Sequence, residues 1–115
     1  MSDRLTLLQK EGASYEKHDD TPTVTFVTSR ESLTLPYHSL QWMRRDSGNG
    51  TLLLQIDAIR IILHGERLHA LWRELQLYRV RQIHEEREEK PDTRQSHVNR
   101  IEILIPEDDL ERDAG

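Results

Sequence analysis

The feature that most constrains the fold of this 115-residue chain is a series of short segments, between residues 24 and 63, in which apolar residues occupy every second position. Side chains of a β-strand point alternately to its two faces, so this spacing indicates strands that bury one face. The apolar sets are Val24 and Phe26; Leu33 and Leu35; Leu40 and Trp42; Leu52, Leu54 and Ile56; and Ile59, Ile61 and Leu63. They predict about five strands of an antiparallel sheet.

The segments between these strands contain residues that favour turns. Residues 47–50 (SGNG) supply glycine and asparagine, which tolerate a positive φ, and the pair Asp57 and Ala58 is short enough for a tight turn. Pro36 has no amide hydrogen to donate, so we expect it to end its strand or to lie at a sheet edge.

A helical repeat replaces the alternation after Gly65. At about 100° per residue, one side of such a helix collects Leu68, Leu71, Trp72, Leu75 and Tyr78. We expect this stripe to pack against one face of the sheet. Beyond Tyr78 the pattern does not decide whether residues 80–86 continue the helix or form an extended segment.

These elements predict the α+β class: a small curved antiparallel sheet of about five strands, one C-terminal amphipathic helix packed on one face, and a short extra strand at residues 101–105. This half-barrel is analogous to pleckstrin-homology-like domains in fold only, since those have more strands before the helix and no specific motif matches. We assign no family. The expected organisation is a flexible segment (1–21), a single domain (22–85), and a charged linker, the extra strand and an acidic tail (86–115).

Composition excludes several classes of protein. The chain has no cysteine, which excludes a disulfide scaffold, thiolate metal sites and a cysteine nucleophile. No apolar run approaches the ~20 residues that cross a bilayer, and the first residues lack the pattern of a secretory signal. We therefore expect a cytoplasmic protein without membrane association. The net charge of −5 is uneven, because residues 22–84 carry eight arginines against five acidic residues.

Two short stretches carry residues that could do chemistry. His64 and His69 are five residues apart, which is about 140° around a helix, and a zinc site needs three or four converging ligands. Tyr37, His38 and Ser39 are adjacent, whereas a nucleophile and its base normally face each other across a fold. We therefore expect no catalytic residue, no metal and no cofactor, and we do not expect an enzyme.

By the same alternation, several apolar residues point to the face of the sheet that the helix leaves uncovered. If contiguous, they would mark a site for a partner. The residues expected at this interface are Val27, Met43, Leu53 and Ile62 on the strands, Leu77 on the outer side of the helix, and Ile101, Ile103 and Ile105 on the extra strand. They favour a non-catalytic interaction or scaffold module that forms a homodimer or binds another protein. Whether residues 101–105 pair within their own chain or with a partner stays open.

The alternative function is weak binding of nucleic acid through arginines of the central domain. The candidate contacts are Arg30, Arg44, Arg45, Arg60 and Arg79. Residues 22–84 contain no lysine, both ends of the chain are acidic, and no signature of an RNA-binding module occurs, so we rank this function second. The sequence gives no expectation about a small-molecule ligand.

Overall fold

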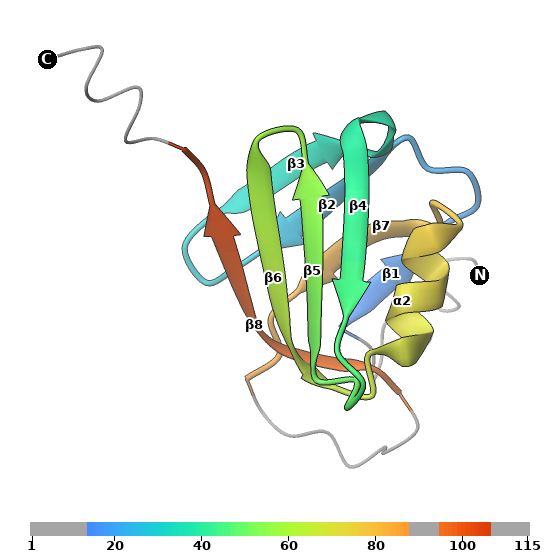
Figure 1. Cartoon of the computed structure of the whole chain (residues 1–115), viewed down its shortest axis with the longest axis vertical. Helices are drawn as coiled ribbons and strands as arrows, with labels where there is room; N and C mark the ends of the chain where they lie inside the picture. The colour runs from blue at the N-terminus through green and yellow to red at the C-terminus, as the bar shows by residue number, and fades with distance from the viewer. Residues whose placement is uncertain (1–13, 88–94, 107–115) are drawn as a thin grey trace, which may run out of the picture.

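The computed structural model describes residues 14–87 and 95–106, which form a small α+β protein with two four-stranded sheets and an α-helix (Figure 1). The first sheet has the order β1-β7-β2-β3, with β1 (Tyr15–Lys17), β2 (Thr23–Val27), β3 (Ser32–Pro36) and β7 (Val80–His84). The second has the order β4-β5-β6-β8, with β4 (Leu40–Arg45), β5 (Thr51–Ile56), β6 (Ile59–Glu66) and β8 (His97–Leu104). Neighbouring strands are antiparallel except β2 and β7, which are parallel.

The core lies between the two sheets, which overlie one another in Figure 1, with the helix α2 (His69–Gln76) at one side. Strands β2, β5 and β6 contribute alternate residues to it, as the period of two predicts. Its buried members are Val24, Phe26, Leu35, Tyr37, Leu52, Leu54, Ile56, Ile61, Leu63, Leu68, Leu71, Leu75, Val80, Ile83, Val98 and Ile101. The segments predicted as strands between residues 24 and 63 therefore all form strands.

Strand β4 differs from the prediction in which face it buries. The register with β5 shifts between Leu40 and Trp42, so one extra residue interrupts the alternation. As a result Met43 packs against the core, whereas Trp42 keeps 37% of its surface exposed. The assignment of Trp42 to the core and of Met43 to the open face was wrong.

The predicted helix forms, but its apolar stripe is shorter than expected. Leu68, Leu71 and Leu75 are fully buried, and Trp72 is partly buried against the core. The chain then turns through Tyr78 with φ of 57°, which is a left-handed conformation. The N–H of Tyr78 bonds to the carbonyl of Leu75, and the next amide bonds to that of Glu74, which is the pattern of a Schellman C-terminal motif.

The left-handed turn carries Tyr78 out of the core. Its side chain is 43% exposed and its ring stacks on that of Tyr37, with 4.5 Å between the ring centroids. The prediction that Tyr78 faces the core was wrong, because the helix ends two residues before it.

The architecture also differs from a single sheet of about five strands with a C-terminal helix. The described residues contain eight strands in two sheets, and α2 is followed by β7 and β8 (Figure 1). Residues 80–84 are extended, which answers the question that the helical pattern left open. The first sheet includes β1 from the segment expected to be flexible, and residues 1–13, 88–94 and 107–115 lie outside the described residues.

Strand β8 is longer than the predicted segment 101–105 and pairs with β6 of its own chain. The two backbones come unusually close at Gly65, where the register shifts. A Cβ atom on Gly65 would lie 1.7 Å from the carbonyl oxygen of His97. Glycine is therefore required at this position for close approach.

We expect Gly65→Ala to lower the free energy of unfolding by about 3 kcal/mol, because the added methyl group can be accommodated only by displacing the β8 backbone. Gly50→Ala is the matched control, since its Cβ would lie 3.4 Å from the carbonyl oxygen of Gly65. Chemical denaturation of both variants checks this. Equal stabilities would contradict the close approach of β6 and β8.

Candidate functional site

The side of the β4-β5-β6-β8 sheet that points away from the core is called the outer face here. Strand register places its side chains in three rows that run across the strands, because directly paired residues share a face. The first row is Trp42, Gln55, Arg60 and Leu104. The second is Arg44, Leu53, Ile62 and Glu102. The third is Thr51, His64 and Arg100.

The centre and two opposite ends of the outer face are apolar. Leu53 and Ile62 are directly paired on the two central strands and are only partly buried. Trp42 and Leu104, at the two ends of the first row, are 37% and 48% exposed. The guanidinium carbon of Arg60 lies 5.6 Å from the centre of the Trp42 ring, which is a cation–π contact. Each of the four strands thus places one apolar side chain on the outer face.

Charged groups lie around this apolar centre. On β8, Glu102 Oε2 lies 2.6 Å from His64 Nε2 and 3.8 Å from Arg100 Nη2. On β4, Arg44 is exposed at the other end of the same row as Glu102.

Asp46 directly follows β4, and its carboxylate accepts hydrogen bonds from backbone N–H groups of the turn. The N–H of Thr51 lowers the pKa of Asp46 most, and the N–H groups of Gly48 and Gly50 add to this effect. Asp46 therefore stays ionised beside the third row.

A shallow hollow of about 270 Å³ opens at the end of the first row. Gln55, Arg60 and Leu104 form one part of it, and Ala58, Ile105 and Pro106 form the rest. The outer face therefore has a partly exposed aromatic side chain at its β4 end and a depression at its β8 end.

The structure places the predicted interface residues on different surfaces. Only Leu53 and Ile62 lie together on the outer face. Val27 belongs to the other sheet, and Leu77 is exposed at the end of α2. The isoleucines of the extra strand are not on the outer face either. Ile101 is buried and Ile103 packs against the core, and Ile105 follows the end of β8.

Two residues of the outer face were missed by the sequence reasoning. Regular alternation from Leu40 assigned Trp42 to the core, but the bulge in β4 turns it to the outer face. Leu104 was overlooked because it lies between two isoleucines that were expected to face the core. The alternation of Ile101, Ile103 and Ile105 already predicts that Leu104 faces away from the core.

The five arginines proposed for nucleic acid are also separated. Arg44 and Arg60 lie on the outer face, where Arg100 joins them. The other three arginines lie elsewhere. The guanidinium of Arg45 lies over the Trp72 ring, and Arg30 lies in the turn between β2 and β3. Arg79 Nε lies 3.6 Å from Asp19 Oδ1 and 3.5 Å from Glu74 Oε1.

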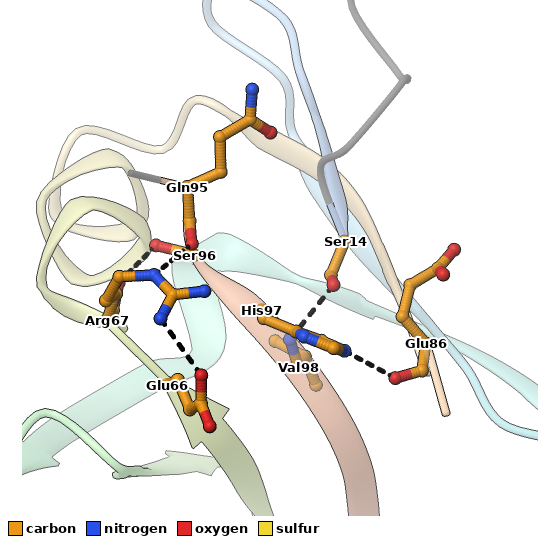
Figure 2. A network of polar contacts seen from close by, with 8 residues as sticks. All are labelled: Ser14, Glu66, Arg67, Glu86, Gln95, Ser96, His97 and Val98. Carbon is orange, nitrogen blue, oxygen red and sulfur yellow. Dashed lines mark hydrogen bonds and ion pairs between the residues drawn. The ribbon is translucent and has the colours of Figure 1, made fainter. Parts of the chain in front are cut away.

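A second polar cluster joins the beginning of β8 to α2 and to the first sheet (Figure 2). Ser96 Oγ donates to the carbonyl of Arg67 and accepts the N–H of Leu71, so it caps the first turn of α2. His97 Nε2 donates to the carbonyl of Glu86 over 2.6 Å, and Ser14 Oγ accepts the N–H of Val98. Each contact satisfies a backbone group, which gives this cluster a structural role.

We expect Ser96→Ala to cost about 1–3 kcal/mol of unfolding free energy, because it leaves a buried N–H and a partly buried carbonyl without their partner. Ser29→Ala is the control, since Ser29 is an exposed serine that bonds to the side chain of Arg87. Thermal or chemical denaturation measures both. If the two variants were equally stable, Ser96 would not cap the helix.

A groove of about 980 Å³ separates the β2–β3 turn from the free edge of β8. An open strand edge is a place where another strand can add. Here the carboxylate of Glu85 accepts the N–H of Ile101 over 2.8 Å, so a side chain already occupies part of this edge. The outer face, unlike the edge, is exposed across all four strands.

Two of the titratable groups singled out in the sequence, His64 and Tyr37, have structural contacts, whereas His38 and His69 are exposed. His64 bonds to Glu102, and within residues 14–87 and 95–106 no three histidine, aspartate or glutamate side chains gather as a cation site. The Tyr37 hydroxyl donates to the carbonyl of Val80 over 2.6 Å and accepts its N–H, and burial raises the pKa of Tyr37 above its usual range. Tyr37, the first residue after β3, thereby connects the end of β3 to β7.

Comparison with known proteins adds no family to this description. No family model matches the chain, and no curated protein and no solved structure matches it. In the described part of the chain, no helix has the length and apolar character required to cross a membrane.

Proposed function

We propose that the chain is a non-catalytic interaction module that binds a protein partner through the outer face of the β4-β5-β6-β8 sheet. The observation that carries this proposal is the group of apolar residues on this face: Trp42 and Leu104 are exposed on its two outer strands, and Leu53 and Ile62 are partly buried at its centre. Contiguous apolar groups on a sheet face are costly to leave in water, and they mark sites of association more often than isolated ones.

The polar groups of the outer face support a protein as the partner. Aromatic residues and arginine are enriched in protein interfaces, and the face combines Trp42 with Arg44, Arg60 and Arg100. Charged groups around an apolar centre have the arrangement of a polar rim. In contrast, the buried hydroxyls and imidazole described above bind backbone groups of the fold.

The direct test uses the full chain as bait in an extract of its source cells. We expect Ile62→Glu to abolish capture of the partner, because it places a charge at the centre of the face. Thr34→Glu is the matched control, since Thr34 is exposed on β3 of the other sheet. Circular dichroism first establishes that both variants are folded, and mass spectrometry then identifies captured proteins, a second copy of the chain included. Identical capture by both variants would overturn the proposal.

Binding of single-stranded nucleic acid is the second candidate function. It is favoured by one observation, that Arg44, Arg60 and Arg100 share the outer face with Trp42, which could stack on a base. The acidic Glu102 on the same face and a net charge of −5 oppose it.

The two candidates predict different responses to salt. We expect no tight complex with single- or double-stranded nucleic acid near physiological salt, measured by fluorescence anisotropy. Sub-micromolar binding that weakens steeply as salt rises, and that is lost in Arg44→Glu, would replace the protein partner with nucleic acid.

A further inference from the structure

We propose that the partner of the outer face is a second copy of this chain, related by a two-fold axis that runs parallel to β5 and β6 and passes between them. This inference rests on the proposed function and adds the identity and orientation of the partner. It is argued from the order of residues in the three rows and from the hollow beside Leu104.

The second row is self-complementary about such an axis. Its order is cationic, apolar, apolar and anionic: Arg44, Leu53, Ile62 and Glu102. A two-fold rotation about an axis between β5 and β6 reverses the order of the strands in the facing copy. Arg44 therefore faces the partner's Glu102, and Leu53 faces the partner's Ile62. Within the described residues Arg44 has no ion-pair partner, so this contact would satisfy its charge.

The orientation of the axis follows from the same charges. If the axis ran across the strands, along the second row, Arg44 would face the partner's Arg44 and Glu102 would face the partner's Glu102. Like charges in contact across an interface oppose association. The order of charges therefore selects the axis parallel to the strands over the axis across them.

The first row gives an independent argument, from shape. The two-fold axis places Trp42, the large exposed residue at the β4 end, opposite the partner's Leu104 at the β8 end. The hollow of about 270 Å³ lies at this position, lined by Gln55, Arg60 and Leu104. The indole of one copy therefore meets the depression of the other, and it does so twice in the dimer. Buried tryptophan in such a pocket is typical of residues that dominate an interface.

The third row extends the same pattern. Arg100 on β8 faces the end of β4, where the partner's Asp46 follows the strand. The backbone N–H groups that bond to Asp46 keep it ionised, as described above. Each end of the three rows thus meets a group of opposite charge or matching shape.

The area of the face sets the expected strength. Four strands at the usual spacing give a face about 19 Å wide and about 20 Å long, so each copy presents roughly 400 Å², about half the area per partner of a standard specific interface. We therefore expect a dimer that dissociates in the micromolar range, and concentrations must span that range in the test.

The experiment is sedimentation of the full chain and of two charge variants, Arg44→Glu and Glu102→Arg. Each variant alone opposes like charges twice across the axis, and we expect each to weaken self-association by about tenfold. In a mixed dimer the Arg44→Glu copy is acidic at both positions and the Glu102→Arg copy is basic at both, so opposite charges meet at both contacts. We therefore expect an equimolar mixture to associate as well as the wild type. Arg30→Glu is the control, because it makes the same charge change in the β2–β3 turn, away from the face.

The outcomes distinguish this inference from the proposed function. Restored association in the mixture, with no effect of Arg30→Glu, supports the second copy and its axis. If the variants do not weaken association, or if the mixture does not restore it, the axis is overturned while the face can still bind a protein. A wild-type chain that stays monomeric at high micromolar concentration overturns the second copy, and the capture experiment with Ile62→Glu then tests the proposed function separately. Circular dichroism of each variant excludes loss of folding.

Discussion

The register between β5 and β6 is the constraint on which the outer face depends. Leu52, Leu54 and Ile56 on one strand and Ile61 and Leu63 on the other are all at most 1% exposed, so the core fixes how the two strands pair. A slip of one residue would expose this entire set and bury the residues of the opposite face. Since alternate residues point to opposite faces, the same register decides which residues share each row of the outer face. Burial on one side of the sheet therefore determines the arrangement of charges on the other.

A second constraint holds β8 in the sheet. The backbone of β8 approaches Gly65 closely. Ser96 binds a backbone group in the first turn of α2, and His97 binds a backbone group of the segment after β7 (Figure 2). These contacts place β8 at the edge beside β6, and with it Glu102 and Leu104 at one end of their rows. The proposed interface therefore depends on a structural cluster that does not itself lie on the outer face.

The sequence predicted the strands that alternate strictly, β5 and β6 above all, and the buried residues of α2. It could not predict the bulge in β4, because an extra residue changes the face of Trp42 and Met43 without any change in composition. It did not reveal β7, where the buried Val80 and Ile83 are three residues apart, a spacing equally typical of a helix. The helix end was missed because Tyr78, and not glycine, adopts the left-handed conformation. Alternation also tells which face of a strand is buried but not which sheet contains it, so two sheets were taken for one.

In the proposed dimer, the outer face binds a second copy of the chain with β5 opposite β6. Isotope-filtered nuclear Overhauser spectra of a mixture of labelled and unlabelled wild-type chains test it most directly, because they detect only contacts between copies. We expect contacts between the methyl groups of Leu53 and the partner's Ile62, and between the indole of Trp42 and the partner's Leu104. Contacts between the indole of Trp42 and β4 of the partner, or no contacts from the outer face in a sample that sediments as a dimer, would contradict this arrangement.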